Sequence, residues 1–516
     1  MPELDRLDSD GKPGEGGKSA TAPVPSTYRT ATDVEASGKR MRRTVVVSLL
    51  WQGSASVVSQ LISWLATLVV IRLLSPADYG LVAMAGLSIG FLMLIGDLGV
   101  GPVVVQAPTL KGPQLQALFG VALWAYLAGA IAAFATAPAV AAFFAEPKLV
   151  PIVRTLSLSF VFAGLYAVPQ ALALRTLEFD RKAKIDVLAT LISSIAALAL
   201  ALSGWGAWSL VVAGVATQAF KAIAFQILYP CLFPPFPSLA VVRDMAHFGG
   251  LITVDRILWF GYTNLDIAIA GRALGGAMVG LYSVALSLAS IPFDKVMSIV
   301  TQVSFSAFSR TQDDRESLRG GMLQALEAVS LLAFPTFFGM AVVAPEALDV
   351  FVGPKWADAV LPFQLLCLAL PFRSLGLLFA PVLFGTGRPR IAVENNALTL
   401  VSVAVALIVA VHWGVVGLCV GWLVGYIPVF CVTAYRTLAT LEMAVGRVIV
   451  VVGLPLAATL AMSAGVVEAR ILLKEALPPV VALGTLSLLG AVIYGGLIVA
   501  FRPQVLRSYW MLAQGK

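Results

Sequence analysis

The side chains that could carry chemistry in this sequence are ionisable residues inside long apolar runs. Arg256, Lys295, Glu327 and Arg373 lie deepest within such runs. Insertion scales put one arginine at the bilayer centre at a cost of about 2.5–3.5 kcal/mol, so several such residues require water or partners. We expect these four side chains to line a functional cavity, with ion pairing between helices as the alternative.

Three other charged residues, Arg154, Asp186 and Lys221, lie nearer to the expected helix ends. A long side chain at such a position can reach the membrane surface, and opposite charges on neighbouring helices can pair. Pairing or snorkelling is therefore the favoured interpretation for these three residues.

Two of the apolar runs also carry a polar face at helical spacing. The faces comprise Gln52, Ser56, Ser59 and Ser63 in the first run, and Asp255, Trp259, Tyr262 and Asp266 in the seventh, with Arg256 and Asn264 beside them. Residues spaced by three and four positions share one side of a helix. Because contact between such polar faces and lipid is unfavourable, we expect the two faces to lie opposite each other across a hydrated cavity.

The composition makes the membrane the only plausible solvent for this chain. Of its 516 residues, 59% are hydrophobic and 12% charged, and the mean hydropathy is +0.90. A soluble domain of this size needs more polar surface. The apolar runs are continuous, which predicts spanning helices and excludes the alternation of a β-barrel. The net charge of +7 arises from basic residues at the ends of the runs, so nucleic acid is not an expected partner.

An internal repeat relates the two halves of the chain. The segment from Arg72 to Ala85 recurs 200 residues later, from Arg272 to Ala285. The identical pairs are Arg72 and Arg272, Leu74 and Leu274, Ala77 and Ala277, Gly80 and Gly280, Leu81 and Leu281, and Ala85 and Ala285. Repeated membrane segments are typical of transporters, whose substrate path lies between the halves. Chance similarity within a small apolar alphabet is the alternative.

About fourteen runs are long enough to span a bilayer. We divide the chain into a disordered tail at 1–38, a six-helix bundle at 39–246, a second six-helix bundle at 247–440, and two further helices with a short tail at 441–516. About 20 lysines and arginines fall on one side of the predicted membrane and about 6 on the other, which predicts that both termini are cytoplasmic.

The segment Arg72–Gln106 resembles the bacterial polysaccharide transporter family of the multidrug/oligosaccharidyl-lipid/polysaccharide exporter superfamily. The resemblance is carried mainly by Leu74–Gly80 and by Gly96–Gly99. It implies an all-α polytopic fold, with two six-helix bundles in a V shape and two appended C-terminal helices, in the bacterial inner membrane. It also implies a substrate in which undecaprenyl diphosphate carries an oligosaccharide repeat unit. Polysaccharide polymerase and a chain-length regulator are candidate protein partners beside the membrane lipids.

For such a substrate, the basic residues acquire a role. Arg256, Lys295 and Arg373, with Trp259 and Asn264 beside them, would line the cavity and offset the diphosphate charge. Coupling to a proton or a sodium ion would involve Asp255, Asp266 or Glu327, and the membrane potential is an equal alternative. The resemblance fixes no catalytic residues, and we expect no enzyme activity, cofactor or metal site.

Three alternatives follow from the same features. A multidrug-type antiporter would favour carboxylates and aromatic rings over deep basic residues, and a lipid II flippase is a close variant of the first hypothesis. A membrane glycosyltransferase or polymerase is disfavoured, because the sequence places no convergent acid–base pair outside the membrane.

Overall fold

The computed structural model describes residues 59–502, except 97–99, 107–109, 111, 177, 234–238, 309–314 and 474–476. It does not describe the side chains at 102, 106, 239–254, 294–308 and 315. The predicted tail at 1–38, the polar residues Gln52 and Ser56, and the side chain of Lys295 therefore lie outside the described residues.

Helices joined by short connections make up the described chain. The first group of helices comprises Ser59–Leu73, α2 (Pro76–Gly96), α3 (Val100–Gln106), α4 (Gly112–Phe144), α5 (Leu149–Leu156), α6 (Leu158–Arg175), α7 (Phe179–Leu202) and α8 (Ala207–Leu228). The second comprises α9 (Leu239–Leu274), α10 (Gly276–Phe308), α11 (Arg315–Val342), α12 (Ala344–Phe351), η2 (Pro354–Ala359), α13 (Val360–Gly376), α14 (Phe379–Gly385), α15 (Pro389–Ala410), η3 (Val411–Trp413) and α16 (Gly414–Thr440). Two more helices follow, α17 (Val445–Leu473) and α18 (Pro479–Phe501).

The chain is a multi-pass membrane protein. Within the described residues, 11 helical stretches are long and apolar enough to span a bilayer, and Ser59–Leu73 is a shorter apolar helix. The predicted count of fourteen is not confirmed. One stretch, Pro389–Thr440, holds both α15 and α16, and α9, which carries Asp255, Arg256 and Asp266, is not among the eleven. Large apolar side chains such as Ile195 and Ile227 are exposed, as lipid-facing side chains are in such a protein.

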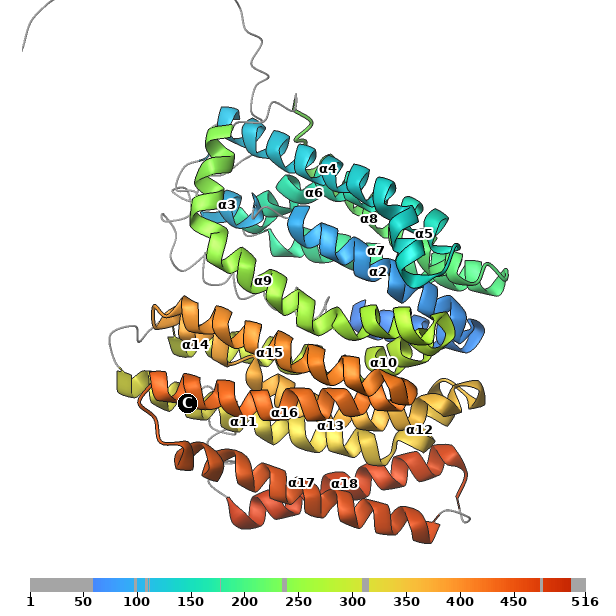
Figure 1. The fold of residues 1–516 in the computed structure, drawn as a ribbon, viewed down its shortest axis with the longest axis vertical. Coiled ribbons are helices and arrows are strands. Elements are labelled where there is room, and N and C mark those ends of the chain that lie inside the picture. Colours follow the sequence, from blue (N-terminus) through green and yellow to red (C-terminus); the bar gives the residue numbers. More distant parts are fainter. Residues whose placement is uncertain are drawn as a thin grey trace, which may run out of the picture.

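The two groups form two bundles that lie one above the other in Figure 1, and α9 runs obliquely between them. The predicted boundary between residues 246 and 247 falls inside α9, because this helix begins at Leu239. Its Phe260 ring meets Phe91 of α2, with ring centroids 6.0 Å apart, while its other side packs along α15. Helix α9 therefore joins the two bundles structurally as well as along the chain.

Helices α2 and α10 cross at the residues that the repeat relates. A Cβ atom on Gly80 would lie 1.7 Å from the carbonyl oxygen of Gly276, and one on Gly280 would lie 1.6 Å from that of Pro76. The two contacts are equivalent under the repeat offset of 200 residues, because Gly80 corresponds to Gly280 and Pro76 corresponds to Gly276. The crossing thus has pseudo-two-fold symmetry, and the repeat read from the sequence is structural rather than chance.

Beside this crossing, the second bundle holds the end of the first helix by hydrogen bonds that we call the clasp. Arg72 donates from Nε to the carbonyl oxygen of Phe351 at 2.9 Å and from Nη2 to that of Val350. Lys355 donates to the carbonyl oxygens of Arg72 and, at 2.7 Å, of Leu74. Trp356 donates from its indole to that of Ile71 at 3.1 Å. These side chains satisfy backbone carbonyl oxygens at helix ends, and the bonds hold the two bundles together at this end of the molecule.

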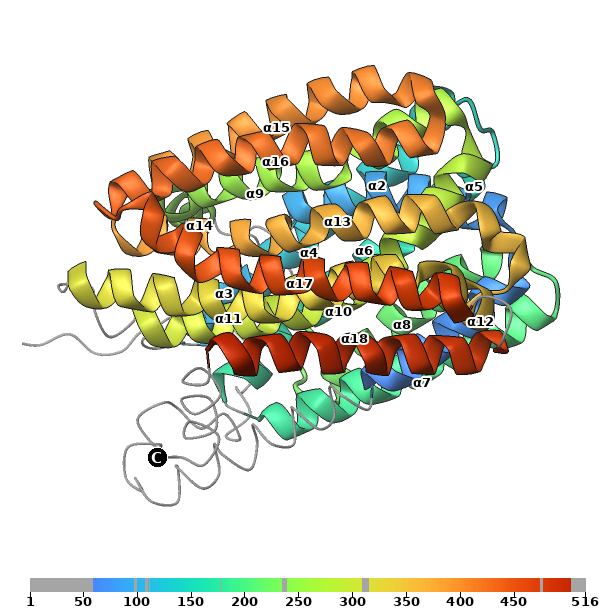
Figure 2. The ribbon, with the colours of Figure 1, turned by 90° about the horizontal axis from the view of Figure 1, so that it is seen from below.

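The helices α17 and α18 form the outermost pair, on the side of the second bundle away from the first (Figures 1 and 2). Helix α17 packs along α11. Arg470 pairs with Glu346 at 2.6 Å, and Arg502 pairs with Glu327 at 2.5 Å. The hairpin is therefore fixed to the second bundle by charged contacts as well as by apolar packing.

Candidate functional site

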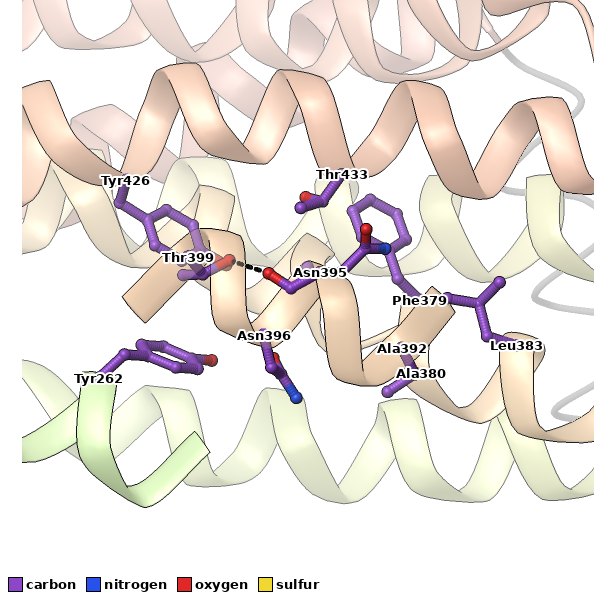
Figure 3. A pocket seen from close by; sticks show the side chains of 11 residues that line it. Tyr262, Phe379, Ala380, Leu383, Ala392, Asn395, Asn396, Thr399, Tyr426 and Thr433 are labelled. Carbon is purple, nitrogen blue, oxygen red and sulfur yellow. Dashed lines mark hydrogen bonds between the residues drawn. The ribbon is translucent and has the colours of Figure 1, made fainter. Parts of the chain in front are cut away.

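A cavity of about 40 Å³ lies inside the second bundle, between α9, α14, α15 and α16. Figure 3 shows Tyr262 and Asn396 on one side of it and Tyr426 and Thr433 on the other. The full lining is Tyr262, Gly376, Phe379, Ala380, Leu383, Ala392, Asn395, Asn396, Thr399, Tyr426 and Thr433. One water molecule needs about 10–15 Å³ on this measure, so this cavity holds a few waters or one small ion. It is too small for a sugar.

The polar side chains around the cavity offer acceptors. Thr399 donates its hydroxyl hydrogen to the carbonyl oxygen of Asn395 at 2.8 Å, and Thr433 donates to that of Phe430 at 3.1 Å. Both hydroxyl oxygens therefore keep only lone pairs for the cavity. The side-chain oxygen of Asn395 is buried and has no hydrogen-bond partner among the described residues. A buried acceptor without a donor is costly, and a cation or a donor group in the cavity would satisfy it.

A carboxylate stands next to this group of acceptors. Asn396 donates from its amide nitrogen to Oδ1 of Asp255 at 2.7 Å, which links α15 to α9. Asp255 is half-buried and lies two helical turns before Tyr262 on α9. Asp255, which the sequence analysis proposes as an ion-coupling residue, therefore lies beside the cavity.

Arg373 on α13 is held between aromatic rings. Its Cζ atom lies 4.4 Å from the centroid of Trp422 and 5.9 Å from that of Phe293. Among the residues that the structure describes, no acceptor is hydrogen-bonded to this guanidinium and no carboxylate pairs with it. A half-buried arginine fixed by ring faces keeps its N–H groups for a ligand.

Asp266 lies behind the same tryptophan and is fully buried. Its carboxylate accepts hydrogen bonds from Tyr282 at 2.5 Å, from the Trp422 indole at 3.1 Å, and from the backbone N–H of Ile267 at 2.7 Å. Three donors saturate most of a carboxylate's acceptor sites. Asp266 therefore positions Trp422 under Arg373 and is poorly placed to exchange an ion with the cavity.

The other residues predicted from the sequence are scattered. Arg256 and Trp259 are exposed on α9, and Asn264 donates back to the carbonyl oxygen of Phe260 at 3.0 Å. Glu327 pairs with Arg502, just after the end of α18, which is the ion pairing between helices that was the alternative to a place in the cavity. Its helix, α11, presents that face to the C-terminal hairpin, which sequence periodicity alone does not reveal.

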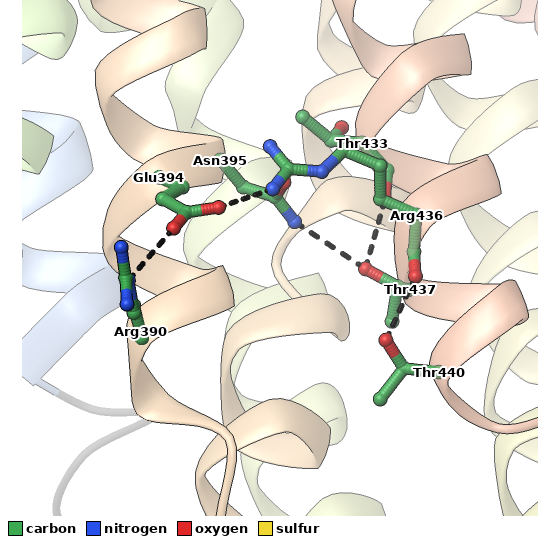
Figure 4. Close-up of polar contacts among 7 residues, drawn as sticks. All are labelled: Arg390, Glu394, Asn395, Thr433, Arg436, Thr437 and Thr440. Carbon is green, nitrogen blue, oxygen red and sulfur yellow. Dashed lines mark hydrogen bonds and ion pairs between the residues drawn. The ribbon is translucent and has the colours of Figure 1, made fainter.

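A polar seam continues from the cavity between α15 and α16 (Figure 4). The Asn395 amide lies 3.5 Å from the hydroxyl of Thr437. Further along, Glu394 pairs with Arg436 and, at 3.1 Å, with Arg390. The asparagines and threonines of this seam were missed because they are uncharged, although two adjacent asparagines inside an apolar run are a usable signal.

Comparison with known proteins places these features in a family. The family described as "Polysaccharide biosynthesis protein" matches residues 69–361, which is more than half of the chain. The Escherichia coli K12 lipopolysaccharide biosynthesis protein WzxC is 25% identical over 386 residues, which cover 74% of this chain and 78% of that protein. The Rhizobium meliloti succinoglycan biosynthesis transport protein ExoT is 28% identical over 318 residues, 61% of this chain and 64% of that protein.

A solved structure shares the fold. The lipid II flippase MurJ, in an inward closed conformation, superposes with a TM-score of 0.70 at 11% identity, over 89% of this chain and 100% of that one. At this identity the likeness concerns the arrangement of helices alone. It agrees with the all-α, two-bundle fold that the sequence predicts.

Proposed function

Because the chain belongs to the polysaccharide biosynthesis protein family, within the superfamily that its sequence resembles, we propose that it is a flippase for lipid-linked oligosaccharides. Its substrate is an oligosaccharide repeat unit on undecaprenyl diphosphate, and it moves this unit outward across the bacterial inner membrane. The names of WzxC, a lipopolysaccharide biosynthesis protein, and ExoT, a succinoglycan biosynthesis transport protein, support this assignment. Both termini lie in the cytoplasm in this proposal, and a polymerase and a chain-length regulator are its candidate partners.

The observation that carries the proposal is the state of Arg373. An arginine inside a membrane bundle is normally paired, because an unpaired charge there is expensive. Arg373 has aromatic rings around it and no acceptor among the described residues. Its planar guanidinium can bind two phosphate oxygens at once, which suits a diphosphate headgroup better than an ammonium does.

The mechanism in this proposal is alternating access. The predicted orientation puts Arg72 and Lys355 on the outer side, so the clasp and the crossing of α2 with α10 close the outer side in the observed state. Outward release requires these contacts to separate. The headgroup then crosses between the bundles while the prenyl chain stays in lipid.

Energy in this proposal comes from a monovalent cation or a proton bound beside Asp255. The cavity offers the Asn395 side-chain oxygen and the hydroxyl oxygens of Thr399 and Thr433, and Asp255 adds the negative charge. Hard cations bind such oxygen groups, and the cavity volume suits one small ion. Asp255 and the cavity therefore replace Glu327 as the coupling site in this account.

The test is a reconstituted flipping assay. Purified protein in liposomes receives undecaprenyl-diphosphate oligosaccharide labelled on the sugar, and a membrane-impermeant reagent measures how much label reaches the far leaflet. We expect transfer that depends on the protein and increases with a sodium or proton gradient or with a membrane potential. Absence of transfer under every gradient and potential would end the proposal.

A further inference from the structure

The first bundle contains a charged cluster that the site in the second bundle does not use. On α7, Lys182 pairs with Asp186 at 2.6 Å, and Lys221 on α8 pairs with the other oxygen of the same carboxylate at 3.1 Å. Pairing, one of the two outcomes expected for Asp186 and Lys221, is thus observed, and Lys182 joins the same carboxylate. Two ammonium groups share one carboxylate, so the cluster keeps one excess positive charge.

The cluster lies near one end of the α7–α8 hairpin and faces away from its exposed apolar side. Asp186 is seven residues from the start of α7 and Lys221 seven residues from the end of α8, which places both about 10 Å along their helices from the same end of the hairpin. On α8, Ile223 and Ile227 are 60% and 72% exposed and mark the lipid side. Lys221 points about 160° away from Ile223 and about 120° away from Ile227 around the helix.

Hydrogen-bond donors outnumber acceptors at this cluster. Each ammonium has three N–H groups, and each uses one on Asp186. Gln218, one turn before Lys221, accepts from the hydroxyl of Tyr166 at 3.2 Å, so its amide N–H groups add two more donors. No other acceptor contacts these three donor side chains in the described part of the chain. The lysine side chains are 18% and 24% exposed, so a ligand can reach them.

From this arrangement we infer that Lys182, Lys221 and Gln218 bind the diphosphate group of the lipid-linked substrate where it enters the first bundle. A diphosphate offers several acceptor oxygens and negative charge, which is what the cluster lacks. The inference rests on the proposed function, and it assigns the phosphate a contact on each bundle, Lys221 on the first and Arg373 on the second. Asp186 competes with the diphosphate for the two lysines, and the lysines leave Asp186 when the diphosphate binds.

The cluster can be tested by binding alone, without transport. The full protein is placed in nanodiscs of phosphatidylcholine, and a short-chain prenyl diphosphate is titrated while ligand-induced thermal stabilisation is measured. Loss of one charge-assisted contact should weaken binding about tenfold in Lys221→Gln and in Lys182→Gln. Lys184→Gln is the matched control, because Lys184 lies on the same helix and is 62% exposed. We expect the control to bind as the wild type does.

The sign of the Asp186 effect separates binding from a structural ion pair. Asp186→Asn removes the competitor, so the diphosphate should bind more tightly although the protein without ligand is less stable. The double variant Lys182→Gln/Asp186→Asn keeps the one excess positive charge of the cluster. It replaces the single variant Asp186→Asn if that protein does not fold. Its affinity for the diphosphate should be at least that of Lys182→Gln. Unchanged affinity in all lysine variants, with only lower stability, overturns the inference.

Competitors identify the ligand. Tighter binding of the prenyl diphosphate than of inorganic diphosphate, each dependent on Lys221, supports a lipid-linked substrate. Equal affinity for the two, or displacement of the prenyl diphosphate by phosphatidylglycerol in the nanodisc, overturns the assignment to the carrier lipid. If the wild type binds the prenyl diphosphate and the lysine variants bind it with the same affinity, this inference fails while the proposed function stands. If the wild type binds no prenyl diphosphate, the proposed function fails with it.

Discussion

Gly80 and Gly280 lie against each other's helices at the point where the two halves of the molecule cross. Each occupies a position where a Cβ atom would overlap a backbone carbonyl of the other helix, at 1.7 Å and 1.6 Å. Only glycine allows backbones this close, and the contact recurs at both members of the repeat. The crossing therefore holds the two halves together in this structure, and in the proposed alternating-access mechanism it is the joint that separates.

Alanine at Gly80 or Gly280 should open this crossing. The added methyl group cannot fit against a carbonyl at this distance, and overpacking of this kind costs about 1–3 kcal/mol. We expect spin labels placed on α2 and α10 to report longer distances in both variants than in the wild type. Gly86→Ala is the control on α2, because nothing lies within 4 Å of its Cβ position. Unchanged distances in Gly80→Ala would contradict the role of the crossing.

Removing the clasp should loosen the same end of the molecule. Lys355→Gln and Arg72→Ala each delete hydrogen bonds to carbonyl oxygens of the other half. A cysteine introduced near this end should then react faster with an impermeant thiol reagent added outside the cell. Arg272→Ala is the control, since the described residues show Arg272 exposed and without such contacts. Equal labelling rates in Arg72→Ala and Arg272→Ala would refute the clasp as an outer closure.

Asp255→Asn should separate transport from its energy source. The amide keeps a hydrogen-bonding side chain next to Asn396 but removes the charge that a cation or a proton needs. We expect residual downhill flipping in liposomes that no longer responds to a sodium or proton gradient. Asp349→Asn, an exposed carboxylate on α12, should leave the response intact. A gradient response retained in Asp255→Asn would move the coupling site elsewhere.

The sequence predicts the helical membrane fold and the repeat, and it marks Arg373 and Asp255 as ionisable residues inside apolar runs, because these depend on local features. Continuous apolar runs dictate helices, and a charge inside such a run demands an explanation wherever it lies. Which face of a helix meets which neighbour is a tertiary property, and here the sequence misleads. Glu327 turns to Arg502, 175 residues away, and Asn395 contributes an oxygen that has no partner in the described part of the chain and that no charge pattern marks.

The pair of Glu327 and Arg502 should be structural. Glu327→Gln and Arg502→Gln should each lower stability by about 1 kcal/mol, since the pair is partly exposed. In a double-mutant cycle the two losses should not add, because either change already breaks the contact. Both variants should keep the gradient response of the wild type. A response lost in Glu327→Gln, with stability unchanged, would restore this residue to the coupling site.

The most direct test of the account is the flipping rate of Arg373 variants in the same liposomes. Arg373→Gln should lower the rate at least about tenfold, the effect of losing about 1.4 kcal/mol of binding to the diphosphate in the transition state. Arg373→Lys should recover part of this loss, because it restores the charge without the planar fork. Arg272→Gln should flip substrate at the wild-type rate. A properly folded Arg373→Gln protein that flips as fast as the wild type would contradict the central claim that this arginine receives the headgroup.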